Sequence, residues 1–167
     1  MTLGSFRRGY ERVLEWICIV LMIALAVEVT AGVLFRYSGH SLVWYDEVAT
    51  ILLAWVTFYG SALAVLKHAH MGVPEIVRML PPDWRVAAAV VAQLCSIAFF
   101  VLLAWVGYSI LEILASDRLV SLPDVPVAFA QSTIPISAVL IVIAQLLVFP
   151  ELLREARALP AHAEKPA

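Results

Sequence analysis

The chain has 167 residues, of which 63% are hydrophobic and 14% charged, and its net charge at pH 7 is −2. Because soluble domains carry about 25% charged residues, this composition excludes an ordinary water-exposed globular surface. No basic patch interleaved with aromatic residues is present, so nucleic acid is not an expected partner. Cys18 and Cys95 lie inside apolar runs, which favours two small buried side chains over a disulfide or a metal pair.

Four apolar runs, at about residues 13–35, 48–66, 86–114 and 126–149, determine the predicted fold class. Each is close to or above the roughly 20 residues that a helix needs to cross about 30 Å of hydrocarbon, and none alternates as barrel strands do. The sequence therefore predicts an all-α integral membrane protein with four transmembrane helices. Residues 1–12 are expected to form a short interfacial segment, and residues 150–167 a mostly disordered tail.

The first run contains one carboxylate, Glu28, deep in its apolar sequence. An acidic residue there costs about 2.5–3.5 kcal/mol, so we expect Glu28 to face protein or to be protonated. Ala24, Glu28 and Gly32 recur at every fourth position and form one small-residue face. We favour a hydrogen-bonded helix contact over a proton or cation site, because no other deep acid could form a relay. Residues 24–26 have the form of a signal-peptidase site, but the run is too long for a signal's apolar region and no cleavage is expected.

The hairpin between the first two runs gathers charged and aromatic residues. Trp44 and Tyr45 fit the aromatic belt at a membrane interface, and Tyr37 follows the first run. Asp46 and Glu47 begin the second run, where a carboxylate suits the positive end of the helix dipole. We hypothesise that Arg36 pairs with these two acids and clasps the hairpin. The alternative is that all three extend into water, where an exposed ion pair contributes only about 0–1 kcal/mol.

Small and aromatic residues mark the second run and the connector that follows it. Trp55 lies on one of its faces, and Gly60 with Ala64 supplies a small face on which another helix can pack. His70 and His68 follow the run, two residues apart, so on a helix they cannot chelate one metal as an i, i+4 pair would. We interpret them as polar residues at a helix exit.

Two prolines shape the fourth run. Pro126 suits its first turn, whereas Pro135 falls inside it and predicts a kink. The hydroxyls of Ser132, Thr133 and Ser137 can satisfy the backbone carbonyl that Pro135 leaves without a donor.

The eleven basic residues are distributed unevenly. Nine belong to the N-terminal segment, the 67–85 connector and the tail, whereas the other two connectors hold one each, Arg36 and Arg118. The positive-inside rule therefore predicts that both termini are cytoplasmic. No catalytic triad or dyad can be assembled and no phosphate-binding glycine loop is present, so an enzyme is not expected.

A series of motifs resembles a known family. Phe35-Arg36-Tyr37, Trp44-x-x-Glu47, Trp55, Gly60-x-Ala62-x-Ala64, His70-Met71-Gly72-Val73 and Leu80-Pro81-Pro82 follow one another as in the DctQ-like small membrane subunit of tripartite ATP-independent periplasmic (TRAP) transporters. Pro126 and Pro135, nine apart, are similar to the two prolines of that family's fourth helix. The resemblance covers about residues 10–150, with departures from the family's pattern at His68 and Met71.

The resemblance implies a non-enzymatic scaffold in the inner (cytoplasmic) membrane of a bacterium or archaeon. Its partners would be the lipid bilayer, a large TRAP membrane subunit that carries an organic acid with sodium ions, and a periplasmic solute-binding protein. It implies no cofactor in this subunit, the sodium ions being expected in the large one. The residues singled out for subunit packing or for the clasp are Glu28, Gly32, Arg36, Tyr37, Trp44, Asp46, Glu47, Trp55, Gly60, His70, Pro126 and Pro135.

Two alternatives stay open from the residues alone. Small multidrug antiporters also have four short helices and one membrane glutamate in the first helix, which would make this protein a homodimeric proton-coupled exporter that uses Glu28. The long connectors, and the lack of aromatic residues around Glu28 in its own helix, argue against that reading. An assembly subunit of another membrane complex would share the scaffold chemistry and differ in its partner.

Overall fold

The computed structural model describes residues 3–40, 42–67 and 82–158. The predicted all-α class is confirmed, and the described residues hold four helices long and apolar enough to cross a membrane. They contain no strand, only an isolated bridge between Arg118 and Pro126. The elements are α1 (Leu3–Tyr37), α2 (Tyr45–Leu66), α4 (Pro82–Ile113), the 3-10 turn η1 (Leu114–Ser116), α5 (Val127–Gln131) and α6 (Thr133–Ala158).

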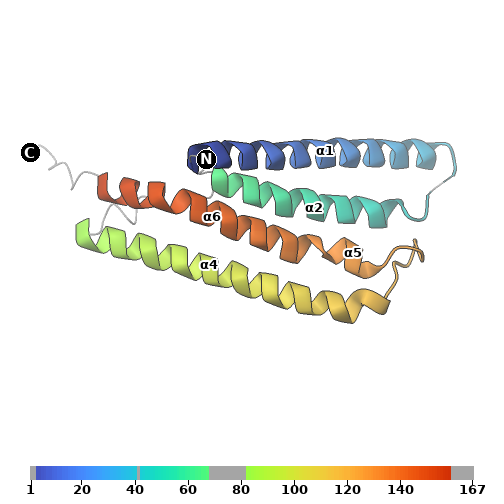
Figure 1. The fold of residues 1–167 in the computed structure, drawn as a ribbon. Coiled ribbons are helices and arrows are strands. Elements are labelled where there is room, and N and C mark those ends of the chain that lie inside the picture. Colours follow the sequence, from blue (N-terminus) through green and yellow to red (C-terminus); the bar gives the residue numbers. More distant parts are fainter. Residues whose placement is uncertain (1–2, 41, 68–81, 159–167) are drawn as a thin grey trace, which may run out of the picture.

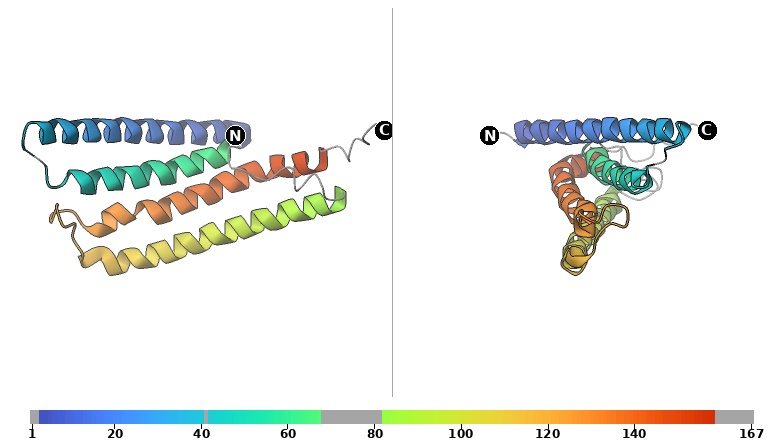
Figure 2. Two further views of the ribbon diagram at one scale, coloured as in Figure 1. Left: turned by 180° about the vertical axis from the view of Figure 1, so that it is seen from behind. Right: turned by 90° about the vertical axis from the view of Figure 1, so that its right-hand side faces the viewer.

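The four long helices form an open array, in which α1 packs on α2, α2 on α6, and α6 on α4 (Figure 1). Figure 2 shows in its right-hand view that α1 crosses the other helices obliquely. Because α1 and α4 occupy opposite edges of the array, each leaves much of its surface uncovered. Large apolar side chains such as Val27 and Leu102, both more than 60% exposed, lie on these edges.

The two ends of the array differ in charge. The start of α1 and the end of α6 lie at the same end, which we call the basic end (Figure 1). Residues 38–40, 42–44 and 117–126 lie at the opposite end, which we call the connector end. Because the first and last helices begin and end on the same side, the chain runs between the two ends of the array an even number of times. The described basic end carries Arg7, Arg8, Arg12, Lys67, Arg85 and Arg154, and the connector end carries Arg36 and Arg118.

A glycine ends α1 where the chain turns toward α2. Gly39 has a φ of +81°, a conformation that favours glycine because a Cβ would be strained there. Its N–H donates to the carbonyl of Arg36 at 3.2 Å, and the N–H of His40 donates to that of Phe35 at 3.1 Å. This pair of bonds is a Schellman motif, and it satisfies carbonyls that the end of the helix would leave unpaired.

Some helix boundaries differ from the sequence prediction. Residues 3–37 form one continuous helix, so no break separates the predicted interfacial segment from the first span. The last helix was expected to end near 149 but continues through Pro150 to Ala158, into the predicted tail. Pro150 is exposed, so water at the membrane surface can satisfy the carbonyl that proline leaves without a donor. Likewise α4 begins at Pro82 rather than 86, since proline suits a first helical turn.

The best-packed region lies toward the basic end, where α1, α2 and α6 meet. Leu14, Leu66 and Ile141, one from each helix, are at most 2% exposed. Two alanines, Ala62 and Ala144, are completely buried beside them and allow the helix backbones to approach closely.

Candidate functional site

A tight contact joins α1 to α2 at Gly32. The ring of Tyr45, the first residue of α2, lies directly over this buried glycine. A Cβ added at Gly32 would overlap Cδ2 and Cε2 of the ring and lie 2.7 Å from its Cζ. No larger residue fits unless the ring moves, so a residue expected in the interfacial belt in fact packs on the small-residue face of α1.

Glu28 lies one turn away from Gly32 on the same face of α1. Its Oε1 atom is buried and accepts no hydrogen bond from any residue that the structure describes. The hydrogen-bonded helix contact expected for Glu28 therefore stays a prediction.

The structure gives the Glu47 carboxylate a partner other than the predicted arginine. Its Oε2 accepts a hydrogen bond from the N–H of Ser121 at 2.8 Å, and its Oε1 accepts one from the N–H of Val120 at 3.2 Å. Arg36 is exposed, and no ion pair among the described side chains joins it to Asp46 or Glu47. Two consecutive loop amides need acceptors, and one carboxylate satisfies both. Glu47 thus ties the start of α2 to the 117–126 connector rather than to the end of α1.

The connector held by Glu47 has backbone bonds of its own and displays an apolar residue. The N–H of Leu119 donates to the carbonyl of Val125 at 3.1 Å, and Leu119 is only 9% exposed. The next residue, Val120, is 91% exposed. An anchored turn therefore presents one valine outward at the connector end.

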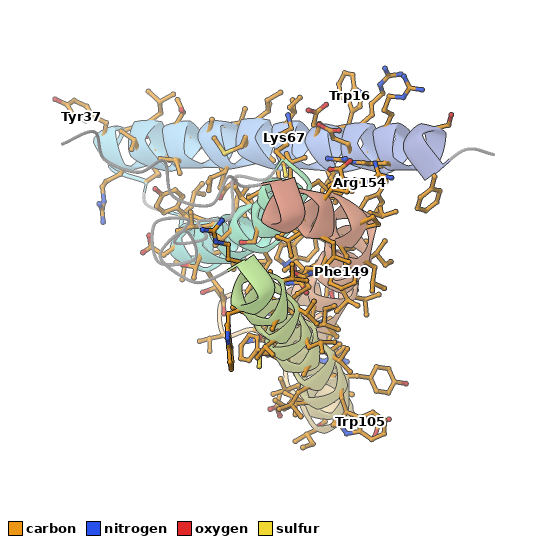
Figure 3. The ribbon with its side chains drawn as sticks, turned by 90° about the vertical axis from the view of Figure 1, so that its left-hand side faces the viewer. Trp16, Tyr37, Lys67, Trp105, Phe149 and Arg154 are labelled. Carbon is orange, nitrogen blue, oxygen red and sulfur yellow. The ribbon has the colours of Figure 1, made fainter. Side chains whose placement is uncertain are left out.

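The remaining hairpin residues make fewer contacts. Tyr37 is 94% exposed at the end of α1 (Figure 3). Trp44 is partly buried at the N-cap of α2 and provides no side-chain cap bond. Asp46 is exposed, and its backbone carbonyl accepts the hydroxyl of Thr50 at 2.7 Å.

Trp55 connects α2 to α5. Its indole N–H donates to the carbonyl of Ala130 at 3.0 Å, and its ring lies 5.2 Å from that of Phe129, measured between centroids. Pro135 has no backbone N–H to donate, and the helix breaks between α5 and α6. The indole N–H of Trp55 therefore adds a hydrogen bond to a backbone carbonyl near this break.

The predicted interruption of the fourth helix is present as the break between α5 and α6 (Figure 1). Pro135 lies in the first turn of α6, and Ser132 lies between the two helices with its hydroxyl donating to the carbonyl of Phe129 at 2.7 Å. Pro126 stands directly before α5, as its N-cap, rather than within the first turn.

Trp55→Phe tests the tryptophan contact. Phenylalanine keeps a ring beside Phe129 but removes the donor to Ala130, so we expect a loss of about 1 kcal/mol of stability. Thermal unfolding of the purified protein in detergent measures it. Trp105→Phe is the matched control, because Trp105 is 75% exposed and points away from the array (Figure 3). Equal melting temperatures for the two variants would contradict the assigned role.

Two further glycines differ in their surroundings. Apart from its chain neighbours and its own helix backbone, no atom lies within 4 Å of a Cβ added at Gly60. The packing of another helix on Gly60 stays a prediction. Gly107, which sequence reasoning missed, is buried in α4, and its added Cβ would lie 3.2 Å from Cδ of Pro135. The sequence did contain a signal for Gly107, because a glycine inside an apolar run often marks a contact between membrane helices.

Ion pairs at the basic end, also missed, connect three helices. Arg7 of α1 pairs with Glu151 of α6 and donates to the carbonyl of Leu66, the last residue of α2, at 3.0 Å. Lys67 follows α2, and its Nζ lies 2.5 Å from Oε1 of Glu15 of α1. The hydrogen bond to Glu15 raises the pKa of Lys67, so the lysine stays charged at neutral pH.

Uncharged polar groups join α4 to α6. The amide of Gln145, which is 3% exposed, donates to the hydroxyl of Ser96 at 2.6 Å. Gln93 reaches the backbone carbonyl of Gln145 at 3.4 Å. These glutamines act as polar contacts between membrane helices.

His70 and His68 lie outside the described residues. Within the described ranges, no three His, Cys, Asp or Glu residues are placed to hold a metal ion. Cys18 is partly buried as a free thiol, whereas Cys95 is exposed on α4 rather than buried as predicted, because that side of α4 has no neighbouring helix.

Comparison with known proteins identifies the family. The DctQ component of tripartite ATP-independent periplasmic transporters matches residues 25–155. The C4-dicarboxylate TRAP transporter small permease protein DctQ of Vibrio cholerae is 30% identical over 101 residues, which are 60% of this chain and 42% of that protein. The sialic acid TRAP transporter permease protein SiaT of Haemophilus influenzae is 32% identical over 72 residues, 42% of this chain and 12% of that protein.

A third relative, the uncharacterized protein y4mM of Sinorhizobium fredii, is 31% identical over 136 residues, 79% of this chain and 25% of that protein. The chain thus spans less than half the length of each of these relatives. The family match covers the C-terminal third of α1, all of α2, α4 and α5, and nearly all of α6. The chain therefore belongs to the DctQ-component family of TRAP transporters.

Proposed function

We propose that this chain is the small permease subunit that scaffolds a large, sodium-coupled membrane subunit for uptake of an organic acid. A periplasmic solute-binding protein delivers the solute, and the complex resides in the inner membrane with both termini of this chain in the cytoplasm. The observation that carries the proposal is an open helix array in a DctQ-family chain. In the most apolar stretch of α4, no residue is buried within the chain itself. In the most apolar stretch of α1, only 6% of the residues are buried.

The uncovered edges support the need for a large partner. A four-helix protein that worked alone would gain by closing its helices around one core, whereas here α1 and α4 lie at opposite edges. The SiaT relative supports the same idea, because this chain matches only 12% of that longer permease. We therefore infer that a separate membrane protein covers one or both edges.

The names of two relatives suggest the class of solute. C4-dicarboxylate and sialic acid are both carboxylic acids, and we carry that class to this chain without choosing between them. In this proposal the large subunit and the binding protein select the solute.

The experiment is uptake by proteoliposomes that contain this chain together with the large TRAP subunit from the same cell. We expect uptake of a radiolabelled organic acid that requires the solute-binding protein, an inward sodium gradient and this chain. Potassium in place of sodium, and liposomes that lack this chain, serve as controls.

Glu28→Gln distinguishes the proposal from the exporter reading. A scaffold keeps most of its uptake when this one carboxyl becomes an amide, whereas a proton-coupled exporter loses all transport. Full uptake in the absence of this chain, or a homodimer that exports lipophilic cations through Glu28, would overturn the proposal.

A further inference from the structure

A hollow lies on the outer side of α1, near its N-terminus. Its volume is about 340 Å³. Gly9 faces open space, because a Cβ added there would meet no atom within 4 Å apart from its chain neighbours and its own helix backbone. At 100° per residue this side of α1 is opposite the side that carries Leu14, which is buried against α2 and α6. The residues that line the hollow are Ser5, Arg8, Gly9 and Arg12.

One cation of the hollow lacks a compensating acid. Arg7 and Lys67, on the inner side of the helices, lie within ion-pair distance of the carboxylates of Glu151 and Glu15. Arg12 is exposed, and in the described parts of the chain no carboxylate lies within ion-pair distance of it. Arg12 therefore brings an uncompensated positive charge to the hollow.

Past the hollow, toward the C-terminal end of α1, the same side of the helix becomes apolar. Trp16 lies one turn beyond Arg12, is 62% exposed and points away from the other helices (Figure 3). Val20, Ile23 and Val27, each close to 60% exposed, continue this outer stripe. At 1.5 Å per residue, Trp16 to Val27 extends about 16 Å, roughly half of a 30 Å hydrocarbon layer.

We propose that the hollow and the outer stripe together bind one anionic phospholipid. Arg12, with Arg8, receives the phosphate, Trp16 lies at headgroup level, and an acyl chain follows the outer stripe. An apolar stripe alone would not indicate a bound lipid, because every membrane helix has one. Here it begins directly beneath a hollow with two arginines, and arginine side chains near a membrane surface attract anionic headgroups.

A free phosphate shares the headgroup chemistry but makes no use of Trp16 or of the outer stripe. The proposal therefore commits to a lipid. It does not depend on the large subunit, so it can be tested on the full chain alone.

Native mass spectrometry of the full chain in detergent measures the binding. We expect phosphatidylglycerol to remain bound at concentrations at which phosphatidylcholine does not. Arg12→Gln should weaken phosphatidylglycerol binding about fivefold, and Arg8→Gln with Arg12→Gln about 25-fold. Arg36→Gln is the matched control, because Arg36 is also exposed and lies at the opposite end of α1. It should leave the binding unchanged.

A second measurement locates the acyl chain. Phosphatidylglycerol with brominated acyl chains should quench tryptophan fluorescence, and Trp16→Phe should remove most of that quenching. Equal losses of binding from Arg12→Gln and Arg36→Gln, equal retention of phosphatidylcholine, or displacement of the lipid by soluble glycerol phosphate would each overturn the proposal. So would quenching that Trp16→Phe leaves unchanged.

Discussion

Gly32→Ala should lower the stability of the protein by about 1–3 kcal/mol, the usual cost of adding a methyl group where packing leaves no room. The added Cβ would overlap the ring of Tyr45, so either the ring leaves the contact or α1 moves away from α2. Alanine has the higher helix propensity, by about 1 kcal/mol, so helix propensity alone predicts a gain in stability. A loss therefore reports the contact with Tyr45.

Thermal unfolding in detergent measures this effect, and the chain offers its own control. Gly60→Ala adds the same methyl group within an apolar helix, where no atom apart from its chain neighbours and its own helix backbone lies within 4 Å, so the stability of this variant should stay the same or rise. The double variant Gly32→Ala with Tyr45→Ala should be little less stable than Tyr45→Ala alone, because residues in contact are not additive. Equal melting temperatures for Gly32→Ala and Gly60→Ala would show that the ring does not need the glycine.

The same pair of glycines shows how far the sequence can predict this fold. Long apolar runs identify membrane helices because their length must match the bilayer, and the four spans were predictable for that reason. Gly32 and Gly60 both lie in such runs, and nothing local distinguishes them. Only the position of the neighbouring helix decides that a Cβ added at Gly32 would meet an aromatic ring, whereas one added at Gly60 would meet no atom apart from its chain neighbours and its own helix backbone.

The charged contacts were harder to predict for a different reason. Arg36 was the expected partner of Glu47 because opposite charges suggest a pair, whereas backbone amides carry no residue-specific signature. In the structure the backbone N–H groups of Val120 and Ser121 donate to Glu47 instead. At the basic end a signal did exist, because Glu11 and Glu15 lie four residues apart on α1 and Lys67 contacts both.

Glu47→Ala should release the 117–126 connector from α2. Both oxygens that accept the N–H groups of Val120 and Ser121 are lost, and these amide hydrogens should exchange with solvent about tenfold faster. Hydrogen–deuterium exchange of the full chain in detergent, read on peptides that cover residues 117–126, measures the change. Glu47→Gln retains one acceptor oxygen and should give an intermediate rate.

Two matched variants separate this contact from a general effect of charge. Asp46→Ala removes the neighbouring exposed carboxylate and should leave the exchange unchanged, and Arg36→Ala should do the same. If Arg36→Ala accelerated exchange as much as Glu47→Ala, the predicted hairpin ion pair would be restored as the explanation.

In the proposed transporter, Glu47→Ala should also reduce uptake several-fold. The large subunit should still co-purify with this variant, because the connector lies at one end of the array and the helix edges are untouched. Loss of co-purification would instead place Glu47 in the packing of the two membrane subunits.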